Sequence, residues 1–222
     1  MLHTARVVLW KDLKIEMRTK DAVSAALVFS VLVLVIFNFA LDVNTPEMRR
    51  LGAGFFWVAF AFSGTLSLNR SFALEKESGA GRALALAPVD PAGVYLGKFL
   101  ANLVFLVVTQ IAVLPAFIVF FNVPIVPDRL WALAVSFILG SAGFAAVGTL
   151  FSAVASNTRM REFLLPLLFL PLVVPALIGA VETTSFALGA VDNASFWFRL
   201  LIVYDVIFVT VSLMVFEYAL EE

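Results

Sequence analysis

The chain has 222 residues, of which 62% are hydrophobic and 14% charged. The apolar residues form runs of roughly twenty, the length that a helix needs to cross a bilayer, and short loops hold most of the charges. This composition excludes an ordinary soluble domain and predicts an all-α membrane protein, because a segment inside lipid must satisfy its own backbone hydrogen bonds. The loops are too short to bury a separate core, so we expect residues 1–222 to form a single transmembrane domain. The net charge of −1 does not identify a partner.

Residues 1–21 are predicted to form an amphipathic elbow helix at the membrane surface, ahead of the first span. Its apolar side chains lie near one side of the helix, and Trp10 suits the headgroup zone. A charged flank that only fixes orientation is the alternative. The alternation of charged and apolar residues argues against a cleavable signal peptide. The apolar side chains are Ala5, Val8, Leu9, Leu13 and Ile15, while Lys11, Lys14 and Arg18 point elsewhere.

Six apolar runs are predicted to span the membrane as helices. The third helix should begin early, because Gly93, Tyr95 and Lys98 continue its helical pattern. We expect Lys98 to extend its ammonium outward to the membrane surface along its own stem. The six runs cover residues 22–41, 51–68, 99–121, 130–155, 163–181 and 196–216.

Lys and Arg are distributed unevenly between the two sides of these spans. If the N-terminus is inside, the inner segments 1–21, 70–98 and 156–162 carry eleven of them, and the outer segments carry four. Such residues accumulate in cytoplasmic loops. The pattern therefore predicts a multi-pass inner-membrane protein with both termini in the cytoplasm. The four outer residues are Arg49, Arg50, Arg129 and Arg199.

Two predicted spans have unusual compositions. The fifth contains Pro166, Pro171 and Pro175, each of which removes a backbone donor and clashes with the preceding turn. We expect that helix to be bent or broken, either as a hinge or only to fit its neighbours. The fourth carries small residues that allow close packing, within the chain by default or with a second copy in a homodimer. These are Gly140, Ser141, Ala142, Gly143, Ala145, Ala146 and Gly148.

Polar side chains inside the spans are candidates for an intramembrane site. Asp205 is the most unusual, since an ionised carboxylate in lipid is costly unless it is paired or hydrated. It is either a functional residue or a structural group that joins two helices. Its candidate hydrogen-bond donors from another span are Asn102 and Gln110. The other polar residues in the spans are Asn38, Thr109 and Ser136.

The densest polar stretch, residues 70–91, follows the second span on the predicted cytoplasmic side. It is long enough for two short helices, and the first would end after Glu77 at Gly79. Leu84 and Leu86 then supply an apolar edge that can dock into the groove of a partner. An ordinary solvated loop is the alternative.

The sequence offers little for catalysis or cofactor binding. Its one histidine, His3, lies away from every span, and the chain has no cysteine, so we expect no metal or haem centre within one chain. The pair Gly97 and Lys98 has no preceding glycine loop, so ATP is not expected to bind here. We therefore expect no enzyme activity and no cofactor bound by this chain alone.

Residues 69–99, together with 54–69 and 216–222, resemble the haem exporter protein B (CcmB) family, the membrane subunit of the cytochrome c maturation ABC transporter. The likeness extends to the number of spans and the chain length. Gly81 and Arg82 depart from the family pattern, because relatives usually carry leucine and an acidic residue there. The matching positions are Arg70, Phe72, Glu75, Gly79, Leu84, Leu86, Pro88 and Lys98.

The resemblance implies a fold like that of ABC-2 type permeases, with an elbow helix, six spans and a cytoplasmic coupling element at residues 70–91. That element, including Glu77 and Arg82, would rest on an ATP-binding subunit similar to CcmA. The implied partners also include membrane proteins similar to CcmC and CcmD and a haem chaperone similar to CcmE. ATP would bind to the partner subunit, and haem would be cargo of the complex. No nucleic-acid partner is expected.

Other readings share the physical features of this chain. An ABC-2 permease that exports a lipid, a drug or a polysaccharide would have the same spans and loops. A membrane scaffold without transport would use residues 70–91 only as a docking patch. A haem-ligating protein is disfavoured, because no histidine lies in or beside a span.

Overall fold

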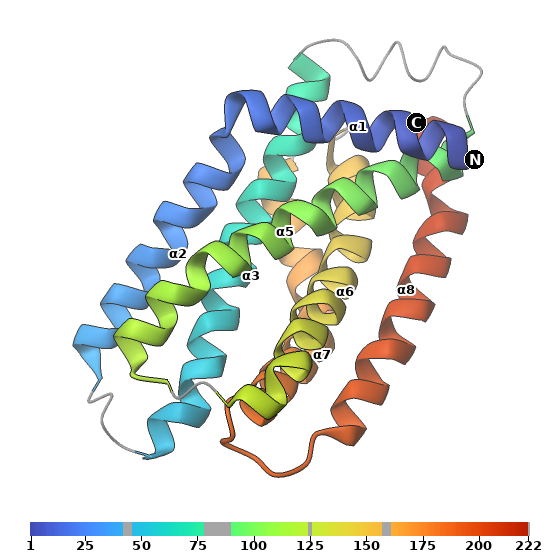
Figure 1. The fold of residues 1–222 in the computed structure, drawn as a ribbon. Coiled ribbons are helices and arrows are strands. Elements are labelled where there is room, and N and C mark those ends of the chain that lie inside the picture. Colours follow the sequence, from blue (N-terminus) through green and yellow to red (C-terminus); the bar gives the residue numbers. More distant parts are fainter. Residues whose placement is uncertain (42–45, 78–89, 124–125, 157–160, 222) are drawn as a thin grey trace.

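The computed structural model describes residues 1–41, 46–77, 90–123, 126–156 and 161–221 (Figure 1). Within these ranges the chain forms seven α-helices and one short 3-10 helix, and no strand. In chain order the elements are α1 (Leu2–Thr19), α2 (Asp21–Ala40), α3 (Pro46–Glu77), α5 (Pro91–Phe121), η1 (Pro127–Arg129), α6 (Leu130–Ser156), α7 (Arg161–Ala187) and α8 (Ser195–Glu221).

Six of these helices, α2, α3, α5, α6, α7 and α8, are long and apolar enough to cross a membrane. This confirms the prediction of an all-α protein with six spans. Helix α1 lies across one end of the bundle, and both chain termini lie at that end (Figure 1). We call it the α1 end. An elbow helix outside the spans is confirmed, and the side of the membrane that the α1 end faces stays a prediction.

The turn between α1 and α2 is built from two local contacts. Lys20 adopts a left-handed conformation with φ of 56°, which ends α1 and redirects the chain. The Glu16 carboxylate then accepts a hydrogen bond of 2.9 Å from the backbone N–H of Val23 in the first turn of α2. That amide has no partner within its own helix, so Glu16 serves as a cap from the preceding helix.

Helix α5 begins before the predicted third span. Asp90 caps it by accepting a hydrogen bond of 3.2 Å from the N–H of Ala92, and Pro91 occupies the first turn, where its missing N–H costs nothing. The predicted early start is therefore confirmed, and the first two turns of α5 lie at the α1 end. Pro115 lies inside the helix without ending it.

Helix α3 is longer than the predicted second span and continues nine residues past Leu68, to Glu77. The first part of the 70–91 stretch is thus the end of this helix, not a separate short helix. Residues 69–77 contain no glycine or proline, so nothing in them interrupts the helical hydrogen bonding. The described part of α3 reaches Glu77, and the predicted helix end at Gly79 falls in residues 78–89, outside the described ranges.

We expected Pro166, Pro171 and Pro175 to bend or break helix α7; the helix is continuous over its 27 residues, so it is not broken, and a bend stays a prediction. Pro175 has no N–H for the carbonyl of Pro171, four residues earlier. At the adjacent carbonyl, Leu172, the Tyr204 hydroxyl of α8 donates a hydrogen bond of 2.9 Å. This bond ties α7 to α8 one residue away from the carbonyl that the proline leaves without its helical partner. The hinge role of the prolines stays a prediction.

Helix α6 is central to the bundle and contacts α3, α5, α7 and α8. Its glycines make this possible. A Cβ atom at Gly140 would collide with the Trp57 ring, and one at Gly148 would collide with the Leu68 side chain. The close packing predicted for these small residues is confirmed within the chain at both positions. A homodimer stays a prediction.

The end opposite α1 is held by hydrogen bonds from two side chains to backbone carbonyls of neighbouring segments. Arg129 of η1 donates from Nη1 to the carbonyls of Phe186 and Val191, both at 3.0 Å, and its guanidinium lies 4.5 Å from the centre of the Phe186 ring. Asn38 of α2 donates to the carbonyl of Phe120 in α5. These contacts fix the ends of four helices at the side of the bundle away from α1.

Candidate functional site at the α1 end

Two glycines bring α1 against α5. A Cβ atom at Gly93 would lie 2.7 Å from the carbonyl oxygen of Met1, and one at Gly97 would lie 2.7 Å from that of Ala5. Glycines four residues apart lie on one helix face, so together they form a groove that admits the backbone of another helix. Helix α1 occupies this groove, and Val8 packs beside Gly97.

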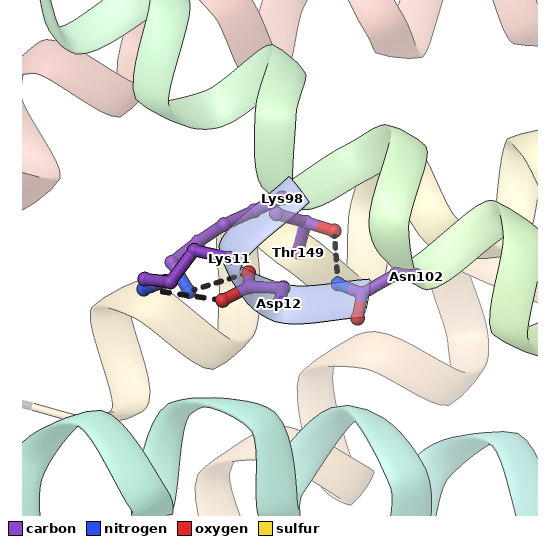
Figure 2. Close-up of polar contacts among 5 residues, drawn as sticks. All are labelled: Lys11, Asp12, Lys98, Asn102 and Thr149. Atoms are coloured by element: carbon purple, nitrogen blue, oxygen red, sulfur yellow. Dashed lines mark hydrogen bonds and ion pairs between the residues drawn. The ribbon is translucent and has the colours of Figure 1, made fainter. Parts of the chain in front are cut away.

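A buried ion pair lies next to this contact (Figure 2). Lys98 is only 2% exposed, and its ammonium lies 3.5 Å from Oδ2 of Asp12 on α1. Lys11 approaches the other carboxylate oxygen at 3.1 Å from the partly exposed side. The expectation that Lys98 extends outward is therefore wrong. Helix α1 covers Lys98 and brings a carboxylate to it, so its charge is compensated inside the protein.

The first residue also contacts the start of α5. The terminal ammonium of Met1 lies 3.0 Å from Oδ2 of Asp90, the cap of α5. This hydrogen bond holds the pKa of the Asp90 carboxyl below its ordinary value of 3.8. The contact is therefore fully present at neutral pH and is lost only as the pH falls through that lowered pKa. Because both groups are exposed, it contributes little to stability.

A regular set of polar contacts continues from Lys98 into the bundle, between α5 and α6. Asn102 donates to the hydroxyl of Thr149 at 2.9 Å (Figure 2), and Ser141 donates to the side-chain oxygen of Gln110 at 3.1 Å. From the first pair to the second, α5 advances eight residues and α6 steps back eight, as two antiparallel helices require. The two pairs therefore fix the register of α5 on α6.

A third helix joins this pair near the α1 end. The hydroxyls of Tyr95 on α5 and Ser212 on α8 both donate to the carbonyl oxygen of Ala146 on α6, at 3.1 and 3.3 Å. Tyr95 is fully buried, and Ser212 is 1% exposed. Helices α5, α6 and α8 are thus joined at one acceptor, and α1 is joined to them through Lys98.

Asp205 is buried on α8 but does not belong to this network. Among the described residues, neither of its carboxylate oxygens has a hydrogen-bond partner. A Cβ atom at Gly143 would lie 2.8 Å from its Oδ1, so the carboxyl packs against α6. The expectation that Asn102 or Gln110 donates to Asp205 is wrong, because neither Asp205 oxygen accepts a hydrogen bond from a described residue and Asn102 donates to Thr149 instead.

The predicted coupling residues fall on different parts of the structure. Lys98 has the only described side chain among them, and it faces α1. Four others lie on the last turns of α3, where the structure describes only the backbone, and the remaining five lie outside the described residues. The four are Arg70, Phe72, Glu75 and Glu77, and the five are Gly79, Arg82, Leu84, Leu86 and Pro88. Their role as an ATPase contact stays a prediction.

Sequence reasoning missed the partners of this network. Asp12 stood among the charges of the N-terminal flank, and nothing local distinguished it from a solvated residue. Thr149 and Ser141 looked like ordinary small residues of an apolar span. The spacing of Gly93 and Gly97 was a usable signal, because two glycines four apart are typical of a face where helices pack closely.

Six spanning helices, a surface helix packed across their ends and a polar network at that end define a polytopic permease-type membrane protein. The chain belongs to the CcmB family, since the family model described as CcmB protein matches residues 3–221.

Curated relatives agree with this assignment. The chain is 32% identical over 177 residues to heme exporter protein B of Rhodobacter capsulatus, covering 80% of each chain. The heme exporter protein B of Paracoccus denitrificans has the same identity and coverage. That of Pseudomonas aeruginosa is 27% identical over 187 residues, or 83% of each chain.

Proposed function

We propose that this chain is the membrane permease subunit of a haem export system for cytochrome c maturation. The observation that carries the proposal is the family match over residues 3–221, together with six spans and a helix across their ends. Relatives named for haem export that cover about four fifths of the chain support it. The subunit changes conformation in the membrane, and the energy comes from ATP hydrolysed by a separate subunit similar to CcmA.

The contacts of the α1 end support a route for this coupling. Helix α3 runs into residues 78–89, and α5 begins directly after them, so a force on this connection acts on both helices at once. Lys98 and the glycine groove tie α5 to α1, and the Asn102–Thr149 contact ties it to α6. An ATPase that binds residues 70–91 differently in its two nucleotide states would therefore shift α3 and α5 as levers.

The rest of the complex follows from the family resemblance. Membrane partners similar to CcmC and CcmD sit beside this subunit, and a haem chaperone similar to CcmE is released in its haem-loaded form. Haem is the cargo of the complex and not a resident cofactor of this chain. The α1 end faces the cytoplasm, where the ATPase is located. Reporter fusions test this orientation: a cytoplasmic reporter joined to the C-terminus should be active, and a periplasmic one inactive.

A deletion strain tests the function directly. Cells without this gene should lose covalently attached haem in their c-type cytochromes, measured on haem-stained gels and in reduced spectra, while b-type cytochromes remain. The wild-type gene should restore the c-type signal. Normal c-type cytochromes in the deletion strain would contradict the proposal and favour a permease for another cargo.

Copurification separates a coupled permease from a scaffold. The complex, purified through a tag on this chain, should contain an ATP-binding subunit whose turnover changes when the chain is present in lipid nanodiscs. An ATPase that copurifies but turns over at the same rate with and without this chain would support the scaffold reading instead.

A further inference from the structure

A small cavity lies between α2, α3 and α5, deep in the spans. It has a volume of about 10 Å³, and Ser30, Phe56, Phe60, Ser63, Thr109 and Gln110 line it. Ser30 is the tenth of the twenty residues of α2, so the cavity lies near the middle of that span. All these lining side chains are at most 6% exposed.

The cavity contains an unused hydrogen-bond donor. Gln110 is 1% exposed, and its Nε2 has no hydrogen-bond partner among the described residues, although its Oε1 accepts from Ser141. If the amide were turned round, its oxygen would lack a partner in place of its nitrogen. In either orientation one end of a buried amide needs a partner, and leaving it without one costs about 1–3 kcal/mol.

Two hydroxyls in the same lining offer acceptor sites. Ser63 donates its proton to the carbonyl of Phe60 at 3.1 Å, and Thr109 donates to that of Phe105 at 2.8 Å. Each hydroxyl oxygen keeps a lone pair that can accept a hydrogen bond. The lining therefore presents one donor and two acceptors from two helices, and Ser30 adds a hydroxyl from a third.

We propose that this cavity is a binding site for a single water molecule that joins α2, α3 and α5 in the middle of the membrane. A water needs roughly 10–15 Å³ of such space and two to four polar partners. Such a water accepts from the Gln110 amide and the Ser30 hydroxyl and donates to Ser63 and Thr109, so its four hydrogen bonds go to side chains of all three helices. A larger ligand does not fit this volume.

The water site has a structural consequence for α2. That helix is the least buried of the six spans, with 17% of its apolar window inside the protein, and it meets the bundle mainly through α3 and α5. Because Ser30 lines the cavity, a water there gives α2 a polar attachment at mid-span. This inference does not depend on the cargo or the partners of the protein.

Radiolytic labelling of the full chain in lipid nanodiscs tests the site. X-rays split bound water into hydroxyl radicals that oxidise adjacent side chains, and mass spectrometry measures the oxidation of each phenylalanine. Phe56 and Phe60 should be oxidised several-fold faster than Phe169 and Phe216, which are also buried but lie outside the cavity lining. Equal rates at all four positions would overturn the proposal.

Variants make the test specific. Gln110→Leu removes the donor and should lower the oxidation of Phe56 and Phe60 to the rate of Phe169. Thr109→Val removes one acceptor and should also lower the oxidation of Phe56 and Phe60. This second variant keeps the test valid if Gln110→Leu fails to fold. Ser141→Ala, whose hydroxyl contacts Gln110 from outside the lining, should leave the rates several-fold above that of Phe169. Unchanged oxidation in both cavity variants would contradict a bound water.

Discussion

Lys98 is the most deeply buried charged residue described at the α1 end. Burying an ammonium is costly unless it is paired, and removing one partner of a buried pair is far more damaging than removing a surface charge. Asp12 is the described carboxylate that meets it, and α1 carries that carboxylate. The interaction therefore couples the position of a surface helix to that of a span.

Asp12→Asn should destabilise the protein by about 3 kcal/mol, because it removes a carboxylate charge from beside the buried ammonium of Lys98. Lys11→Met should cost less than about 1 kcal/mol, since Lys11 is 34% exposed and water screens its contact with Asp12. Chemical denaturation in detergent, followed by circular dichroism, measures both. Equal losses in the two variants would show that the Lys98 contact is not the dominant one.

Two glycine-to-alanine variants test the groove: Gly97 lies in it, and Gly54 serves as the control. Gly97→Ala places a Cβ atom 2.7 Å from the Ala5 carbonyl and should destabilise the α1–α5 contact by about 1–3 kcal/mol. Gly54→Ala meets no atom within 4 Å and should stabilise α3 by about 0.5–1 kcal/mol through helix propensity. The midpoints of thermal unfolding should thus move in opposite directions. If both midpoints moved in the same direction, the close contact of α1 with α5 at Gly97 would be contradicted.

At the scale of elements, the turn from α1 to α2 decides how the surface helix is held. Lys20 takes a left-handed conformation that costs a non-glycine residue energy, and Glu16 caps α2 from the helix before it. The sequence predicted a surface helix followed by a span, but not this turn. A lysine gives no sign of a left-handed backbone, and a glutamate seven residues before the N–H group that it caps is outside the usual capping pattern.

Glu16→Ala should free the Val23 amide and expose the first turn of α2, with a loss of about 1 kcal/mol. Hydrogen–deuterium exchange of the peptides that cover residues 19–26 should accelerate, while peptides of α8 stay unchanged. Lys20→Gly should have the opposite effect on stability, because glycine adopts the left-handed conformation without strain. Faster exchange throughout the chain would indicate general unfolding and not the loss of a cap.

The spans themselves were predictable, since apolar length is a strong signal. Their ends were not. Helix α3 passes Leu68 because no glycine or proline interrupts the next nine residues, and α7 continues through its prolines. The hydrogen-bond partners of the polar residues in the spans could not be predicted either. Asn102, Gln110 and Asp205 lie in the spans, as predicted, and the structure shows that they are buried. Their partners depend on the register of α5 on α6, which cannot be read from a single sequence.

At the scale of the whole molecule, the two ends differ in how they are held. The end opposite α1 is held by hydrogen bonds from Arg129 and Asn38 to backbone carbonyls at the ends of α7 and α5. At the α1 end, α3 and α5 are joined to each other by residues 78–89, and α5 is bound to α1, α6 and α8. A movement that starts at this end would therefore reach five of the seven described α-helices directly.

The central claim is that a partner ATPase drives this subunit through residues 70–91. The most direct measurement compares ATP turnover by the purified complex with c-type cytochrome levels in cells, for Phe72→Ala and Glu75→Gln against the exposed control Glu217→Gln on α8. Phe72→Ala and Glu75→Gln should keep ATP turnover but lose c-type cytochromes, while Glu217→Gln should keep both. Normal cytochrome levels in Phe72→Ala and Glu75→Gln would contradict it.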